Sequence, residues 1–133
     1  MRCLLDTCTL YWFLRGDERE LTATAIEASS NLDNERYVSV VSIWEMAIKA
    51  RLGKLEMTVG VGDLLLNRLR QFDFRILDVN YHHASEVYDL PKLVHRDPFD
   101  RLLIAQARVE GLTVITNDPN WSHPEYGLNI LWK

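Results

Sequence analysis

The chain has 133 residues, of which 47% are apolar and 26% are charged. This is the composition of a folded, soluble protein, and it argues against the disordered and membrane classes. The net charge of −4 at pH 7 argues against a protein that binds nucleic acid through a broad basic surface. It is compatible with an enzyme whose acidic pocket holds a cation.

The length fits one domain, so we expect a single domain over residues 1–133. No apolar run approaches the roughly 18 residues that a membrane span needs, and the segment MRCLLDTC does not have the pattern of a signal peptide. We therefore expect a cytoplasmic protein without membrane association, in which Cys3 and Cys8 are reduced thiols. Neither cysteine has partners at zinc-ligand spacing.

The first part of the chain alternates between predicted strands and helices. Residues 2–6 (RCLLD) form a short apolar run that ends in an acid, typical of a buried strand. A helical pattern follows and stops at Gly16, and a second helix over residues 21–32 has Thr22 as a plausible cap. Residues 36–42 (RYVSVVS) are rich in β-branched side chains and predict a second strand.

The clearest predicted helix covers residues 42–55. Ser42 and Glu45 have the spacing of an S-x-x-E capping box, and Gly53 lies where a helix ends. Its expected apolar side consists of Ile43, Met46, Ala47, Ala50 and Leu52.

The second part of the chain continues the alternation. The predicted elements are a helix over 60–72, a strand over 75–79, a helix over 80–90 ended by Pro91, a helix over 97–111, and strands over 112–116 and 128–132. In the helix over 97–111, Asp97 is the expected N-cap, Pro98 the first residue, and Gly111 the residue after the end.

Strands that alternate with helices indicate an α/β chain with a mainly parallel sheet covered by helices on both faces. In such sheets, functional sites form at the carboxyl ends of the strands. Asp6 ends the first strand, Glu45 follows the second, and Asp118 follows the strand over 112–116. Asp100 lies in the first turn of the helix that leads into that strand. We therefore expect these four acids to meet at one edge of the sheet.

Four carboxylates brought together repel one another unless a cation is bound or their pKa values rise. Carboxylate oxygens are the ligands that Mg²⁺ and Mn²⁺ prefer, usually together with substrate phosphate. The sequence thus predicts metal-dependent phosphodiester hydrolysis.

Each acid also has a structural interpretation when it is taken alone. Glu45 fits a capping box, Asp97 an N-cap, Asp100 a favourable position near a helix N-terminus, and Asp118 a turn residue in NDPN. Asp6 is the hardest to explain structurally, because an acid that closes a buried strand has no routine structural role. The shared location of Asp6, Glu45, Asp100 and Asp118 favours the functional interpretation.

The sequence closely resembles the PIN domains, and within them the VapC-like toxin ribonucleases of bacterial and archaeal toxin–antitoxin pairs. The resemblance covers essentially the whole chain, in the segments LLDTCTLYWFL, SVVSIWEMAIKARLGKL, LPKLVHRDPFDRLLIAQA and GLTVITNDP. It implies a three-layer α/β/α PIN-like fold with a mainly parallel, roughly five-stranded sheet. It further implies that Asp6, Glu45, Asp100 and Asp118 match the acidic quartet that holds Mg²⁺ or Mn²⁺. Cleavage of single-stranded RNA, a cognate antitoxin that blocks the pocket, and a homodimer are also implied.

Several neighbouring residues have a possible supporting role. Thr7 is predicted either to orient a metal-bound water or to cap a helix, and Thr116 and Asn117 either contact metal or phosphate or form loop hydrogen bonds. Asp97 is chiefly a cap with an indirect effect on the site. Basic candidates for contacts with RNA phosphates are Arg96, Arg101, Lys49, Arg51 and Lys54, with Arg96 and Arg101 closest to the acids in sequence; surface Lys and Arg are more often only solvated charges.

Other classes of protein fit less well. The histidines lack the spacing of a zinc enzyme, and His95 is the one expected near the pocket, in a structural role. An aspartate-nucleophile phosphatase needs a second acid two residues after Asp6, where Cys8 stands. The main alternative to a nuclease is a PIN-like scaffold that binds RNA or protein with weak or no cleavage.

Overall fold

The computed structural model describes residues 1–92 and 97–133. Within these residues it contains one sheet with the strands β1 (Arg2–Leu5), β2 (Glu35–Ser39), β3 (Arg75–Leu77), β4 (Thr113–Ile115) and β5 (Ile130–Leu131). Every neighbouring pair is parallel, in the order β3-β2-β1-β4-β5. The prediction of an α/β chain with a mainly parallel, roughly five-stranded sheet is confirmed.

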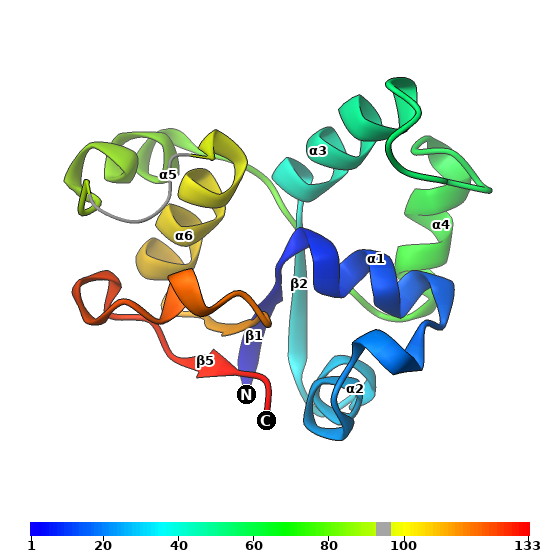
Figure 1. Ribbon diagram of the computed structural model, residues 1–133, viewed down its shortest axis with the longest axis horizontal. Helices are drawn as coiled ribbons and strands as arrows, with labels where there is room; N and C mark the ends of the chain where they lie inside the picture. Colours follow the sequence, from blue (N-terminus) through cyan, green and yellow to red (C-terminus); the bar gives the residue numbers. More distant parts are fainter. Residues whose placement is uncertain (93–96) are drawn as a thin grey trace.

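Helices cover both faces of this sheet. They are α1 (Thr7–Arg15), α2 (Ala23–Ser30), α3 (Val40–Arg51), α4 (Asp63–Gln71), α5 (Tyr81–Glu86) and α6 (Pro98–Glu110), with short 3-10 helices η1 (Glu18–Glu20), η2 (Val87–Asp89), η3 (Pro119–Ser122) and η4 (Pro124–Tyr126). Figure 1 shows α1, α2 and α4 on one side of the strands and α5 and α6 on the other, which gives the three layers expected. None of the helices in the described residues is both long and apolar enough to cross a membrane.

The buried side chains of β1 divide between two cores, because successive residues of a strand point to opposite faces. Cys3 and Leu5 join the cluster formed with α1, α2 and α4. Leu4 joins the cluster formed with α6, which contains Leu103 and Ile104. Both faces of β1 are therefore covered. Asp6 follows its last residue, at the carboxyl-end edge of the sheet and on the middle strand.

The ends of α6 are those that the sequence predicts. Asp97 is the N-cap and accepts hydrogen bonds from the backbone N–H groups of Phe99 and Asp100, Pro98 is the first helical residue, and Gly111 follows with φ of 66°. Only a residue that tolerates the left-handed region ends a helix in this way without strain. The first turn of α6, with Asp100 in it, is therefore fixed by local sequence signals.

The start of α3 differs from the prediction. Residues 40–42 are helical, the N-cap is Ser39, and its hydroxyl accepts a hydrogen bond from Val41 N. The capping box of Ser42 and Glu45 is therefore wrong, because Ser42 lies inside the helix. The run of β-branched residues favoured a longer strand, but the Ser39 cap ends β2 three residues earlier.

Two smaller expectations about helices are also corrected. Leu52 was expected on the apolar side of α3, but it lies after the helix end and is 63% exposed. Residues 80–90 were expected to form one helix, and they form α5 followed by η2. Neither change moves the predicted acids from the edge of the sheet.

Candidate active site

Asp6 follows β1 directly and is buried, with 6% of its surface exposed. Its side chain is the N-cap of α1: Oδ1 accepts a hydrogen bond of 2.9 Å from Thr9 N. Oδ2 accepts a second one of 2.6 Å from the hydroxyl of Thr116. Asp6 therefore has the structural role that the sequence did not reveal, and this role fixes the orientation of its carboxylate. Burial is the main cause that raises the pKa of Asp6 above its usual value, while the hydrogen bonds act in the opposite direction.

Thr116 connects the first and last of the four acids. Besides donating to Asp6, its hydroxyl accepts a hydrogen bond of 3.1 Å from Asp118 N. Asp118 in turn is the N-cap of η3, where Oδ1 accepts from Asn120 N. The turn role predicted for Asp118 is thus present, and it leaves the residue at the same edge of the sheet as Asp6.

Glu45 lies in the second turn of α3 and is 4% exposed. Its Oε2 is 2.6 Å from Lys49 Nζ, one turn further along the helix. Its Oε1 is buried and has no hydrogen-bond partner among the described residues. A buried carboxylate oxygen without a hydrogen-bond donor is unfavourable. This atom is therefore suited to accept a hydrogen bond or to bind a cation.

Asp100 is partly buried at the start of α6. Burial, together with the negative charges of Asp97, Glu45, Asp6 and Asp118 in that order, raises its pKa from 3.8 to about 7, and burial is the largest of these causes. These electrostatic effects require short separations. The carboxylates from four elements therefore act on one another at this site.

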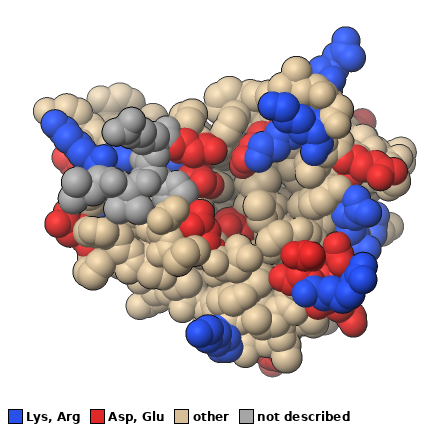
Figure 2. All heavy atoms as spheres, in the orientation of Figure 1, with Lys and Arg blue, Asp and Glu red and all other residues tan. Residues whose placement is uncertain are grey.

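The four acids line one cleft of about 380 Å³. Its lining consists of Asp6, Thr7, Cys8, Glu45, Lys49, Asp97, Asp100, Asn117, Asp118 and Pro119. Figure 2 shows Asp and Glu side chains gathered around a hollow between the α6 side and the α3 side of this face, with Lys and Arg side chains over α3. The structure thus brings together the four acids that the sequence placed at one edge.

The supporting residues lie at or beside the cleft. Thr7 is the first residue of α1 and its hydroxyl donates a hydrogen bond of 3.0 Å to Ser42 Oγ. The cap of α1 is Asp6, so the capping role considered for Thr7 is wrong. Asn117 and Asp97 both line the cleft.

The basic candidates are placed differently from one another. Lys49 lines the cleft and pairs with Glu45. Arg101 donates a hydrogen bond of 3.3 Å to the Pro91 carbonyl. The predictions for Arg96 and His95 fall on positions outside the described residues.

Two features of the cleft were missed in the sequence. The contact between Lys49 and Glu45 has the i,i+4 spacing that favours ion pairs on a helix, and this signal was available. Cys8 lines the cleft, and burial together with the neighbouring Asp6 raises the pKa of its thiol to about 11. No local pattern marks Cys8 as a cleft residue, because its position depends on α3 and α6.

The donor set fits Mg²⁺ or Mn²⁺ in chemistry, since it consists of carboxylate oxygens and includes the buried Glu45 Oε1. The side chains are not arranged as a finished ligand cage. In residues 1–92 and 97–133, no group of three or more His, Cys, Asp or Glu side chains is placed to hold a metal ion. Asp6 is held by Thr116 and Glu45 by Lys49, so a cation would require rearrangement of these side chains.

Comparison with known proteins gives a consistent family and fold. The family model for the PIN domain matches residues 3–125. No curated protein matches the sequence. Among solved structures, VapBC2 from Rickettsia felis bound to a promoter DNA fragment has a TM-score of 0.73 at 16% identity, with 100% of both chains covered.

Two further solved structures are similar to this chain. A toxin–antitoxin complex from Klebsiella pneumoniae has a TM-score of 0.65 at 18% identity and covers 97% of this chain and 95% of its own. FitAcB from Neisseria gonorrhoeae has a TM-score of 0.60 at 19% identity, with coverages of 98% and 96%. At these identities the likeness establishes the fold.

Proposed function

Because the chain belongs to the PIN domain family, we propose that it is an Mg²⁺- or Mn²⁺-dependent endoribonuclease that hydrolyses phosphodiester bonds of single-stranded RNA. The observation that carries this proposal is the acidic cleft, in which Asp6, Glu45, Asp100 and Asp118 come together from four parts of the chain. The pKa of about 7 for Asp100 has burial as its largest cause, and the four neighbouring carboxylates raise it as well. A divalent cation would offset the repulsion between these carboxylates.

In this mechanism the four acids hold the metal. A bound divalent cation lowers the pKa of water and neutralises the charge that develops in an in-line displacement at phosphorus. Both oxygens of Asp6 are held in place, one by Thr9 N and the other by the Thr116 hydroxyl. Glu45 offers its unpartnered Oε1. Asp100, from the first turn of α6, and Asp118, from the segment after β4, complete the set.

The remaining cleft residues serve the substrate. Among the described residues that line the cleft, Lys49 is the basic one, and we assign it to a phosphate of the RNA. Arg101 and Arg96 are further candidates because they are close to Asp100 and Asp97 in sequence. Thr7 and Asn117 are assigned to orienting water or phosphate. Asp97 acts on Asp100 indirectly, through its negative charge and as the N-cap of α6.

We further propose that the chain is the toxin of a toxin–antitoxin pair, that a cognate antitoxin blocks the cleft, and that the chain forms a homodimer. Two of the solved structures described above support the pairing, since one is named as VapBC2 and another as a toxin–antitoxin complex. An apolar groove of about 570 Å³ between α3 and α4, with Trp44 in its lining, supports a protein partner. Trp44 is 57% exposed, and large apolar surfaces of this kind are common at interfaces.

The proposal is tested by cleavage of several single-stranded RNAs with Mg²⁺ or Mn²⁺, comparing the purified protein with its Asp6→Asn variant. Asp33→Asn is the matched control, because Asp33 is exposed and precedes β2, at the opposite edge of the sheet. We expect cleavage by the wild type and by Asp33→Asn, and its loss in Asp6→Asn. Equal behaviour of all three proteins would replace the nuclease with the alternative of a binding module.

A further inference from the structure

A buried polar network surrounds α6 further along the helix than the acidic cleft, and none of its residues lines that cleft. Its centre is Gln106, which is fully buried, as are Ser39 and His83. Gln106 Nε2 donates to the Asp78 carbonyl at 3.3 Å and lies 3.4 Å from His83 Nδ1. Gln106 Oε1 accepts a hydrogen bond of 2.5 Å from the Ser39 hydroxyl. One side chain therefore joins α6 to the N-terminus of α3, to the segment after β3 and to α5.

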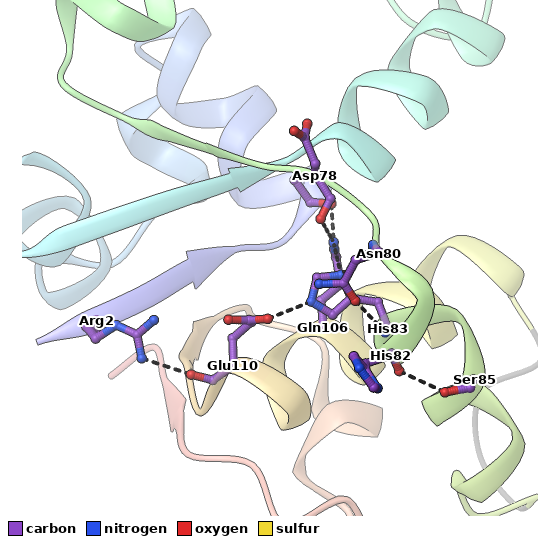
Figure 3. A network of polar contacts seen from close by, with 9 residues as sticks. Arg2, Asp78, Asn80, His82, His83, Ser85, Gln106 and Glu110 are labelled. Atoms are coloured by element: carbon purple, nitrogen blue, oxygen red, sulfur yellow. Dashed lines mark hydrogen bonds and ion pairs between the residues drawn. The ribbon is translucent and has the colours of Figure 1, made fainter.

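The rest of the network fixes the orientation of the Gln106 amide. His83 Nδ1 accepts from Asn80 N at 3.1 Å, so the ring proton is on Nε2, which is 2.8 Å from Glu110 Oε2. Figure 3 shows Gln106 between Asp78 and His83, with the imidazole directed toward Glu110. The Asp78 carbonyl and His83 Nδ1 are both acceptors, so the nitrogen of the Gln106 amide faces them. The amide oxygen consequently faces Ser39 and accepts its hydrogen bond.

The hydrogen bond between Ser39 and Gln106 lies at the same distance in sequence from an acid on each helix. Glu45 is six residues after Ser39, and Asp100 is six residues before Gln106. Six residues of α-helix correspond to about 9 Å. A second contact between these helices lies beside the acids: the rings of Trp44 and Phe99 are 4.8 Å apart. The order of the two contacts shows that α3 and α6 run antiparallel, with the hydrogen bond at one end of their seam and the acids at the other.

We propose that Gln106 is a positioning residue for the metal site, a proposal that rests on the proposed function. Its hydrogen bond to Ser39 sets the register of α3 against α6, and this register sets how Glu45 faces Asp100. Apolar packing alone leaves some freedom of sliding between helices, whereas a buried hydrogen bond has one favourable geometry. The buried oxygens and the amide are costly to leave without partners, so the seam is strongly held in this register.

The test compares Gln106→Leu and Ser39→Ala, which remove the same contact from its two ends, with Leu112→Ala. Leu112 follows the end of α6 and is buried in the core cluster that also contains Leu103 and Ile104. Its truncation therefore controls for a general loss of stability. Two quantities are measured on the folded proteins: nuclear Overhauser contacts between the Trp44 and Phe99 rings, and the dissociation constant of Mn²⁺.

We expect Gln106→Leu and Ser39→Ala to weaken the ring contacts and to weaken Mn²⁺ binding by about ten-fold. This is the lower end of the loss seen when a direct partner of a metal ligand is removed, since these two residues act on the acids only through the helices. The part of their effects that passes through the bond between Ser39 and Gln106 should not add in the double variant. Each variant also loses a second contact, the cap on Val41 N for Ser39→Ala and the bond to the Asp78 carbonyl for Gln106→Leu. Leu112→Ala should retain both properties. If Gln106→Leu does not fold, Ser39→Ala makes the same comparison.

Unchanged ring contacts in the folded variants overturn the positioning role, whatever happens to Mn²⁺. Equal loss in Leu112→Ala overturns it as well, since the effect is then one of stability. A wild-type protein that binds no Mn²⁺ overturns the proposed metal site instead, and the ring contacts still decide whether Gln106 sets the register of the two helices.

Discussion

Thr116 donates a hydrogen bond of 2.6 Å to Asp6 although the two residues are 110 positions apart in the chain. The same hydroxyl accepts from Asp118 N. Parallel pairing of β1 with β4 places the ends of these strands side by side. One small side chain thus holds two of the four acids, and it acts on both through its single hydroxyl group.

Replacement of Thr116 by Val is therefore expected to disturb the site more than its small change in shape suggests. The hydroxyl is buried, so its loss leaves Asp6 Oδ2 and Asp118 N without this partner and costs about 1–3 kcal/mol in the free energy of unfolding. The pKa of Asp6 should rise further, because this hydrogen bond lowers it. Denaturant unfolding measures the stability. Thr113→Val on the same strand is the control, and an equal loss there would contradict the assignment.

The pKa of Asp100 predicts how stability depends on pH. The folded protein holds this proton more tightly than the unfolded chain, since the pKa is about 7 instead of 3.8. The contribution of Asp100 is therefore fully present below pH 3.8 and is lost as the pH rises through 7. Asp100→Asn removes this dependence. The difference in melting temperature between the two metal-free proteins should change across this window in favour of the variant.

Metal binding at the site is expected to have the opposite dependence on pH. A cation binds the ionised carboxylate, so its affinity in the wild type should increase as the pH rises through 7. Asp100→Asn should also lose cleavage, if Asp100 holds the metal. Full activity of this variant would show that the metal site lies elsewhere, and a stability difference independent of pH would contradict the raised pKa.

Asp97 has two effects on α6 that different substitutions separate. Asp97→Ala removes the N-cap and is expected to cost about 1 kcal/mol of stability. Asp97→Asn keeps a good capping side chain but removes the charge that is the largest electrostatic cause of the high pKa of Asp100. Its expected result is a lower pKa of Asp100, measured by NMR titration of the carboxyl carbon. An unchanged titration in Asp97→Asn would contradict the influence of Asp97 on the site.

The contrast between α6 and α3 explains how much the sequence could predict. The bounds of α6 follow from Asp97, Pro98 and Gly111, which act on their own neighbours in the chain. The start of α3 was missed because its β-branched residues favoured a longer strand, although the cap itself is a local bond from Val41 N to Ser39. The contact of Ser39 with Gln106, 67 residues away, has no local signal in the sequence. By contrast, the predicted ends of β1 and β4 were sufficient to place Asp6 and Asp118 at one edge of the sheet. The ties through Thr116, and the position of Cys8 in the cleft, depend on elements that meet only in the folded chain.

The ion pair between Lys49 and Glu45 predicts that Lys49 competes with a metal ion for this carboxylate. Lys49 Nζ is 2.6 Å from Glu45 Oε2, and the other oxygen, Oε1, is buried without a hydrogen-bond partner among the described residues. Lys49→Gln leaves the buried Glu45 without its cation, so the metal-free variant should be less stable. A divalent cation then replaces the lost charge, and binding should be tighter than in the wild type.

The measurement is the rise in melting temperature on addition of Mn²⁺, which we expect to be larger for Lys49→Gln than for the wild type. Arg51→Gln is the matched control, since Arg51 is an exposed basic residue at the end of the same helix and should leave the rise unchanged. Cleavage by Lys49→Gln should nevertheless be weaker, because the variant lacks the cation assigned to the RNA phosphate. A smaller rise with Mn²⁺ would mean that Lys49 holds Glu45 in place for the metal instead of competing with it.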